Sequence, residues 1–578
     1  MAMGRGGCSL LDRAGEIHSG TQSPRCARNA KDTRLYPANL SRTGVLDTKP
    51  YTDEKNRAWI FRTCGYGHGA EWWKEFISTL RMFGYDNVLS IEHEDSLLSP
   101  EEGLRRPAQS SLDRRRFIAG AGVLLSNGIL HALAPLQSKP DDAPAAGRPD
   151  HSLRIEPCTL EISPGVTIRT IGYNGQVPGP LLRLREGVPV TIDVSNASAD
   201  ADIVHWHGLA IDSLNDGAME EGSPMIPVGA THRYSFTPKP SGTRWYHTHV
   251  PAFDNLSLGT YSGQFGFLLI EGRDQPAPYD QEIYLAIHHW EPSFVPMVET
   301  MRAESSNAPL TTGSDVGYKY ATINAHMLGS GEPIRVRQGQ RVLMRLLNAS
   351  ATENVILALP GHSFRIIAMD GNPVPNPRSV DVLSLAVAER VDAVVEMNSP
   401  GVWVLGSTLE KARQMGLGIV VEYAGKTGAP VWKDPAPAEW DYTQFANSTE
   451  APKPDETFTL TFRDFGPMHG SKFDTWTINK KSWPDIDPLI VQQGRRYRLV
   501  FRNGSGDQHP MHLHRHTFEV TRIGSKQTRG LMKDVINVMP LDTVEVDFVA
   551  NNPGDTLMHC HQQLHMDYGF MQLIRYAS

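Results

Sequence analysis

EGVPVTIDVSN, residues 186–196, runs from an acid and a glycine into alternating apolar residues and ends at an asparagine. The pattern recurs as QGQRVLMRLLN at 338–348 and as QGRRYRLVFRN at 493–503. In each copy the asparagine lies nine residues after the glycine, and successive copies are roughly 150 residues apart. Such alternation, bounded by glycine and asparagine, is typical of strands with one buried face. The repeat therefore predicts three copies of one β domain.

A second block keeps step with the first. PSGTRWYHTH, SPGVWVLGST and NPGDTLMHCH follow the three copies in turn, each with a glycine at its third position. Chance similarity of short strands does not explain why both motifs recur three times, in the same order and at similar spacing. We therefore expect an all-β fold of three consecutive β-sandwich domains. Their expected bounds are 151–275, 276–430 and 450–578.

Composition narrows the class of protein. The chain has 578 residues, and its 41 prolines and 51 glycines favour a loop-rich β protein. A net charge of −8 argues against nucleic acid or an anionic membrane as the main partner. The cysteines are too few for a disulfide framework. They lie at positions 8, 26, 64, 158 and 560.

Residues 110–137 hold a basic cluster followed by a modestly apolar run that is too short and too weakly apolar to span a bilayer. Arg114 and Arg115, with Phe117 two residues beyond, resemble the twin-arginine signal that exports folded proteins from bacteria. The alternative is a basic surface patch beside a buried helix. Residues 138–150 have the composition of a linker. The resemblance implies a periplasmic or secreted protein.

The residues before this signal show a different pattern. Residues 51–104 resemble the C-terminal end of the sugar phosphate isomerases and epimerases of the xylose-isomerase-like barrel family. In that family a glutamate on the last strand binds a divalent metal, and Glu92 matches it. One βα unit cannot close a barrel, so we expect a fusion remnant or a mis-set start without activity. Residues 1–50 are expected to be disordered.

Histidines recur at matched offsets in the first and last domains, and the middle domain has none there. In a strand, residues i and i+2 point to one face, so each His-x-His presents two imidazoles side by side. A single such pair is commonly accidental, but four pairs in step predict a metal site between the first and last domains. The middle domain is then a spacer. The paired histidines are His205, His207, His247, His249, His512, His514, His559 and His561.

Only the last domain adds His509, Cys560 and His565. Imidazoles suit copper, zinc or iron, but two imidazoles with one thiolate describe a blue-copper electron-transfer centre. Phe570, ten residues after Cys560, is expected in the axial direction, where it cannot ligate and should raise the reduction potential. A buried structural cysteine is the alternative, but it does not predict the histidines on either side of Cys560.

The segments HWHG, YHTH, HPMHLH and HCHQQLHMDYGF resemble the four copper-binding segments of the laccase-like multicopper oxidases. The resemblance covers residues 154–578 and implies three cupredoxin-like Greek-key sandwiches with four copper ions. It implies a type 2 copper on His205 and His512 and a type 1 copper on His509, Cys560 and His565. The implied type 3 ligands are His207, His247, His249, His514, His559 and His561.

The resemblance also suggests catalytic roles. Asp216 resembles the acid near the type 2 copper that helps to move protons, and His565 is expected nearest to the docking reductant. Many relatives carry a glutamate shortly after HCH, whereas this chain has Gln562, Gln563 and Met566, so only Asp567 could substitute.

The implied reaction is one-electron oxidation of four reducing equivalents, coupled to reduction of dioxygen to water. Phenols, aromatic amines and low-valent metal ions are all candidate reductants. A methionine-rich insertion would favour Cu(I) as the reductant, because thioethers bind Cu(I) well. The methionines of this chain are scattered, so we expect phenols as the reductant. We expect a monomer.

Three alternatives stay open. A copper nitrite reductase also joins a blue copper to a second copper site, but the six further cluster ligands argue against it. A copper-free relative of the same fold, such as the cell-division protein, lacks these ligands. Copper buffering without catalysis uses the same residues.

Overall fold

The computed structural model describes residues 147–272, 279–296, 314–465 and 473–577, and the backbone of two short strands near the N-terminus. These strands are β1 (Ser9–Asp12) and β2 (Glu16–Ser19), which pair antiparallel. The chain forms two compact units, residues 1–142 and 143–578.

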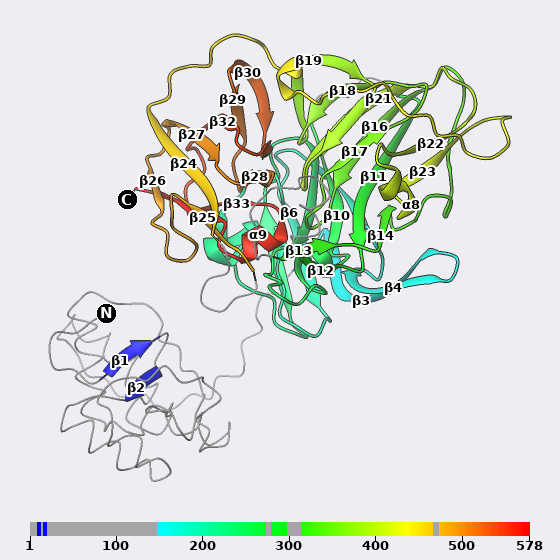
Figure 1. Cartoon of the computed structure of the whole chain (residues 1–578). Coiled ribbons are helices and arrows are strands. Elements are labelled where there is room, and N and C mark those ends of the chain that lie inside the picture. Colours follow the sequence, from blue (N-terminus) through cyan, green and yellow to red (C-terminus); the bar gives the residue numbers. More distant parts are fainter. Residues whose placement is uncertain are drawn as a thin grey trace. The chain divides into compact units, whose positions relative to one another are not determined.

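Several predicted segments lie outside the described residues. They are the isomerase-like fragment 51–104 with Glu92, the export signal 110–137, the first part of the linker 138–150 and, apart from β1 and β2, residues 1–50. The larger unit, by contrast, contains the three predicted sandwich domains (Figure 1).

The first sandwich consists of two four-stranded sheets, with strand orders β4-β3-β6-β8 and β5-β10-β9-β7. The strands are β3 (His151–Ser163), β4 (Val166–Tyr173), β5 (Gly179–Arg185), β6 (Val190–Asn196), β7 (Val204–His205), β8 (Thr231–Phe236), β9 (Gly242–Thr248) and β10 (Phe265–Glu271).

The second sandwich has a six-stranded sheet, β14-β11-β16-β21-β18-β19, a five-stranded sheet, β15-β23-β22-β17-β20, and a hairpin of β12 and β13. The strands are β11 (Gln281–Trp290), β12 (Ser293–Pro296), β13 (Ser314–Gly317), β14 (Tyr320–Ile323), β15 (Ile334–Val336), β16 (Arg341–Asn348), β17 (Val355–Ala358), β18 (Phe364–Met369), β19 (Asn372–Val380), β20 (Val382–Leu385), β21 (Arg390–Glu396), β22 (Val402–Ser407) and β23 (Gly418–Tyr423).

The third sandwich repeats the second, with sheets β25-β24-β27-β32-β29-β30 and β26-β34-β33-β28-β31. The strands are β24 (Glu456–Phe465), β25 (Thr475–Ile478), β26 (Leu489–Val491), β27 (Arg496–Asn503), β28 (His509–Leu513), β29 (Phe518–Ile523), β30 (Lys526–Lys533), β31 (Val535–Val538), β32 (Thr543–Val549), β33 (Thr556–Cys560) and β34 (Met571–Tyr576).

Helices are short wherever the structure describes the chain, and none there is long and apolar enough to cross a membrane. They are α6 (Ser213–Asp216), η1 (Met219–Glu221), η2 (Gly259–Tyr261), α8 (Glu410–Gln414), η3 (Tyr442–Phe445) and α9 (Gln563–Asp567).

The three repeated segments form β6, β16 and β27, each an inner strand of its sheet. The apolar residues that alternate along β6 are buried, as the pattern predicted. The asparagine that ends each strand is buried too, and its amide donates to one backbone carbonyl of the following loop and to one of a segment 30 or more residues further along the chain. Asn196 donates to Asp200 O and Ile226 O, and Asn503 donates to Asp507 O and Val538 O. The asparagine thus fixes the loop that leads into the histidine-bearing strand.

The sandwiches share apolar cores. Trp245 and Phe267 of the first sandwich belong to one buried cluster with Trp290 and Leu347 of the second. A larger cluster contains residues of both the second and third sandwiches. Leu357 and Leu359, at the middle-domain positions that match His205 and His207, are buried at 0% and 1% exposure. There the middle domain has an apolar core in place of a metal site.

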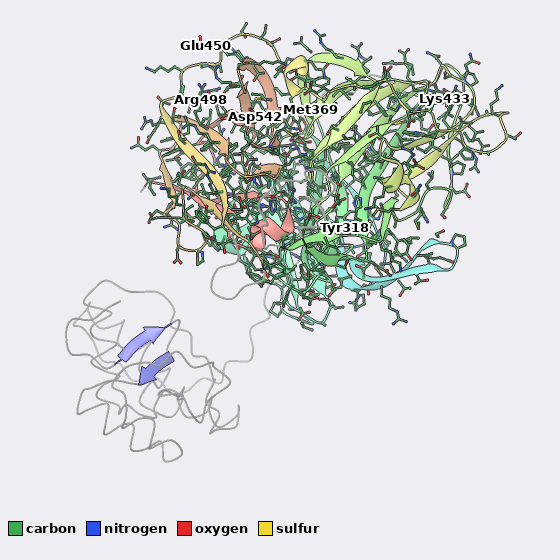
Figure 2. All side chains as sticks on the ribbon, in the orientation of Figure 1. Tyr318, Met369, Lys433, Glu450, Arg498 and Asp542 are labelled. Atoms are coloured by element: carbon green, nitrogen blue, oxygen red, sulfur yellow. The ribbon has the colours of Figure 1, made fainter. Side chains whose placement is uncertain are left out.

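Ion pairs stabilise the pairing of β27 with β32 in the third sandwich. Arg498, which is labelled in Figure 2, lies 2.6 Å from Asp547 through its Nε, and Arg496 lies 2.8 Å from the second oxygen of the same carboxylate. Both arginines are part-exposed, but the carboxylate of Asp547 is buried, so these are charge-assisted bonds to a buried acceptor and not surface ion pairs.

Candidate metal centre

Two antiparallel strand pairs carry the paired histidines. In the first sandwich His205 on β7 lies opposite His247 on β9. In the third, His512 on β28 lies opposite His559 on β33. The second histidine of each pair follows two residues later, just beyond the end of the strand, and the two rings of each pair have centroids 4.8 to 6.2 Å apart. Each sandwich therefore presents four imidazoles from one edge.

The two sets of imidazoles meet. The rings of His207 and His512 stack with centroids 3.7 Å apart, and those of His205 and His514 stack at 4.0 Å. All eight rings are buried, with side chains at most a few per cent exposed. The first and third sandwiches therefore contact each other through these histidines, as their matched positions predicted.

Ring nitrogens converge in three groups of three histidines, and in each group the potential ligand atoms lie within 4.8 Å of one another. His207 belongs to two of the groups. The groups are His205, His207 and His512; His207, His247 and His561; and His249, His514 and His559.

The outer nitrogen of most of these rings is held by an acceptor. The Nδ1 of His205 bonds the carbonyl of Asp216 at 2.9 Å, and those of His247 and His512 bond the carbonyls of Thr248 and Asp534, both at 2.7 Å. Such a bond fixes the proton on Nδ1 and leaves a lone pair on Nε2. This is the arrangement that metal-ligating histidines require.

The inner nitrogens then face one another without a proton to share. His205 Nε2 lies 3.4 Å from His512 Nε2, and His249 Nε2 lies 3.4 Å from His559 Nε2. Neither ring nitrogen of His561 has a hydrogen-bond partner, although the side chain is buried. Buried polar groups are otherwise almost always satisfied, so these unpaired donor atoms fit metal ions between the rings.

The pKa shifts of seven of these rings agree with this interpretation, because burial favours the neutral imidazole, which is the form that binds metal. Burial lowers the pKa of the following imidazoles well below the ordinary value: His207, His247, His249, His512, His514, His559 and His561.

A fourth group contains the cysteine. Cys560 Sγ lies 3.5 Å from His565 Nδ1 and 3.8 Å from His509 Nδ1, and these two nitrogens are 3.3 Å apart. Burial lowers the pKa of His565 to about 3 and raises the pKa of the Cys560 thiol. A buried thiolate therefore needs a cation beside it, and the two neutral imidazoles leave that place to a metal ion.

Aromatic rings surround this fourth group. Trp476 packs on His565 with ring centroids 3.9 Å apart, and the Phe570 ring lies 4.8 Å from the ring of His509. Phe570 is fully buried. The group is therefore dry and rigid on these sides, and Phe570 brings no donor atom to it.

Carboxylates lie behind the imidazoles. Asp216, at the end of α6, accepts from His514 Nδ1 at 2.8 Å, and its second oxygen, Oδ1, has no hydrogen-bond partner. Glu221 in η1 lies 3.4 Å from the same His514 nitrogen. Burial, and next the charge of Asp216, raise the pKa of Glu221 well above its ordinary value.

Comparison with known proteins decides the family. Models of multicopper oxidase domains match residues 154–275, 245–422 and 450–577. Multicopper oxidase MmcO of Mycobacterium tuberculosis is 30% identical over 81% of this chain and 98% of its own length. The chain belongs to the multicopper oxidase family. It is therefore an oxidoreductase that uses dioxygen and a reducing substrate, and its family implies copper as the metal.

Other relatives agree. Laccase-2 of Botryotinia fuckeliana is 26% identical, over 74% of this chain and 82% of its own length. The crystal structure of a multicopper oxidase from Pseudomonas thermotolerans covers 74% of this chain and 98% of that one, with 25% identity and a TM-score of 0.57. The predicted fold of three consecutive cupredoxin-like sandwiches is confirmed.

The structure brings together every residue that the sequence singled out as a ligand, and Asp216 lies among them. Among the described residues, the hydrogen bonds of Asp567 reach no ligand imidazole, and its service as a substitute acid stays a prediction. Its carboxylate accepts from the backbone amides of Ala252 and Phe253 and from Gln563, so it holds α9 against the first sandwich.

Two buried carboxylates beside the cluster, Glu221 and Asp534, were not singled out from the sequence. The offsets that align the histidines mark neither of them. Asp534 has a counterpart in Asp381, which precedes β20 as Asp534 precedes β31, but Asp381 lies in the domain without paired histidines, so the repeat gives no functional signal for Asp534. The unmatched His288 and His289 are buried, with Nδ1 bonded to Ala349 O and Ser350 Oγ, as expected of structural residues.

Proposed function

We propose that this oxidase is laccase-like and holds four copper ions, one at His509, Cys560 and His565 and three among the eight paired imidazoles. One observation carries the proposal. His559 and His561 belong to the imidazole groups, and Cys560 between them belongs to the other group. The side chains on one short segment therefore join a site that suits single-electron transfer to a site that suits a metal cluster.

The geometry supports the implied division of the eight imidazoles. Two of the three groups together contain the six histidines implied for the type 3 ions, namely His207, His247 and His561 in one group and His249, His514 and His559 in the other. The facing Nε2 atoms of His205 and His512 suit the type 2 ion. His509, Cys560 and His565 would hold a copper that supplies one-electron chemistry, and the paired imidazoles would hold the copper at which dioxygen takes up four electrons and, from the protein and solvent, four protons to give two waters.

The chain itself supplies orientation and protons. Hydrogen bonds from the outer ring nitrogens hold the imidazoles as neutral ligands, and the tightly packed rings exclude water. Asp216 is the proton-handling group, because Oδ2 is bonded to His514 and buried Oδ1 is left unpaired. Oδ1 is therefore the atom of this side chain that is free to pass a proton towards the cluster.

Phenols and aromatic amines are the proposed reductants, with low-valent metal ions as the second class. Electron transfer through His565 needs contact but little recognition, and the relative named laccase supports this class. We further propose export through the twin-arginine signal to the periplasm or beyond the cell, and action as a monomer.

An oxygen electrode tests the proposal. Copper-loaded protein should consume dioxygen with a phenol, Cu(I) or Fe(II) offered in turn, and four electrons should be used per dioxygen without hydrogen peroxide. If the protein binds copper and turns blue but consumes no oxygen, the oxidase proposal is wrong and copper buffering is the function that remains. Nitrite consumption without oxygen uptake would assign the protein to the nitrite reductases.

A further inference from the structure

Asp534 lies between β30 and β31 and is fully buried. Its side-chain Oδ1 is 3.1 Å from His207 Nε2, and its backbone carbonyl accepts from His512 Nδ1 at 2.7 Å. One residue of the third sandwich therefore orients an imidazole from the first sandwich and another from the third.

His207 is held in the reverse orientation to its neighbours. His205, His247 and His512 each bond through Nδ1 to a backbone carbonyl. His207 instead turns Nδ1 towards His247 Nε2, at 3.4 Å, and its Nε2 donates to the Asp534 carboxylate. A charged acceptor at Nε2 favours the tautomer whose lone pair is on Nδ1. Without that acceptor the proton could move to Nδ1 and block the ligand atom.

The middle domain supplies the group that holds Asp534 in place. Arg390, at the start of β21, bonds both carboxylate oxygens of Asp534 at 2.6 Å, one through each terminal nitrogen. Arg244 of the first sandwich adds a contact of 3.2 Å to Oδ2. Both arginines are buried at 0% exposure. A bidentate arginine fixes the plane of a carboxylate, which a point charge does not.

Charges balance around this pair. Asp370 accepts from the backbone amides of Arg390 and Val535, at 3.0 and 3.1 Å, and lies 2.9 Å from Lys533 Nζ. Lys533 also pairs with Glu389 at 3.0 Å. The buried cations Arg244, Arg390 and Lys533 thus meet the carboxylates of Asp370, Glu389 and Asp534. An unpaired charge in such a buried network would strongly destabilise the fold, so the pairing of every charge is required.

We propose that Arg390 is a positioning residue of the trinuclear copper site and acts through Asp534 and His207. The middle sandwich is then part of the site, although it provides no ligand, and its role exceeds that of a spacer. This inference rests on the proposed four-copper function. Loss of an outer partner of a metal-bound histidine typically costs 10- to 100-fold in metal affinity, and that is the effect expected at the cluster.

Arg390→Gln tests the inference, with Arg345→Gln as the matched control. Arg345 is also a buried middle-domain arginine, and it pairs with Asp392 at 2.6 Å and Glu282 at 2.7 Å. No contact joins it to Asp534 within the described residues. Both variants lose a buried ion pair, so the melting temperatures of the two copper-free proteins should fall by similar amounts. The full-length proteins are loaded with copper and dialysed against graded concentrations of a chelator.

Arg390→Gln should release cluster copper at a 10- to 100-fold lower chelator concentration than wild type. The electron paramagnetic resonance spectrum of the remaining cluster copper should change, while the blue absorption of the thiolate site persists. Arg345→Gln should match wild type in both measurements. Equal copper retention by Arg390→Gln and wild type, or equal losses in Arg390→Gln and Arg345→Gln, would overturn the inference.

Arg390→Lys decides the matter if the glutamine variant does not fold. Lysine keeps the charge but cannot bond both oxygens of Asp534, so we expect the same selective loss of cluster copper; full retention would count against the inference. Wild-type protein is measured first. If it fails to bind four copper ions, the proposed function itself is wrong, whereas wild-type loading with unaffected variants refutes only the role of Arg390.

Discussion

Thr248 Oγ1 donates a hydrogen bond of 2.7 Å to Asp202 Oδ1 in the first sandwich. These residues hold the positions that Cys560 and His509 hold in the third sandwich. Thr248 lies between two histidines, as Cys560 does, but a hydrogen bond replaces the thiolate–imidazole contact. The first sandwich therefore has the paired histidines of the repeat, but it has no counterpart of the group formed by His509, Cys560 and His565. In the proposed function, this asymmetry leaves one entry for electrons.

Cys560→Ser should remove that entry alone. A hydroxyl is a poor ligand where a thiolate is required, so the blue absorption should vanish and oxidase activity should fall on the order of 10²-fold or more. The eight paired imidazoles do not include Cys560, so three copper ions per chain should remain. Copper analysis and absorption spectroscopy check both results. Cys158→Ser, at the other cysteine of the larger unit, is the control and should keep colour and activity.

The repeat could predict the strands and the eight paired histidines because both recur at fixed offsets. His509, Cys560 and His565 do not recur, and they were predicted from the combination of two imidazoles with one thiolate. The asparagine before each histidine strand is a local signal, since its amide bonds the intervening loop. Arg390 and Asp534 could not be found in this way. Their pairing depends on how the sandwiches pack, which the offsets of the repeat do not specify. The axial placement of Phe570 and the division among copper types remain predictions.

Gly208→Ala should weaken the cluster without altering a ligand. Gly208 follows His207 with φ of +84°, and a Cβ there would lie 2.7 Å from Asp534 Oδ2 and 2.9 Å from Arg390 Nη2. The added methyl must displace the carboxylate that holds His207, and the positive φ adds strain of about 1 kcal/mol. We expect lower copper content and a lower melting temperature. Gly187→Ala is the control, because it has a similar φ of +76° and open space around it. Equal copper content in the two variants would contradict the explanation.

Phe570→Met should lower the reduction potential of the thiolate-bound copper. Phe570 lies against His509 and offers no donor, whereas a thioether stabilises the oxidised ion as a weak axial ligand. A fall of about 59 mV makes oxidation of a one-electron donor tenfold less favourable. Redox titration of the blue absorption measures the shift, and reductants of high potential should be oxidised more slowly.

Phe570→Leu separates ligation from packing, because it opens space without adding a donor and should not lower the potential. An unchanged potential in Phe570→Met would show that residue 570 does not occupy the axial direction.

Asp216→Asn should slow oxygen reduction while leaving electron entry intact. Asparagine can still accept from His514 Nδ1, so the ring keeps its orientation, but an amide cannot take up and release the proton that Oδ1 is placed to hold. Removal of a general acid–base typically costs 10²- to 10⁴-fold, and we expect kcat to fall in about that range with KM for the reductant unchanged. Stopped-flow mixing should show the blue colour bleached by reductant at the wild-type rate and restored slowly by dioxygen.

Asp212→Asn, at the exposed N-cap of α6, is the control, because Asp212 bonds only Asn215 among the described residues. Rapid reoxidation in Asp216→Asn would mean that protons reach the cluster by another route, and buried Glu221, 3.4 Å from His514 Nδ1, would be the next group to replace.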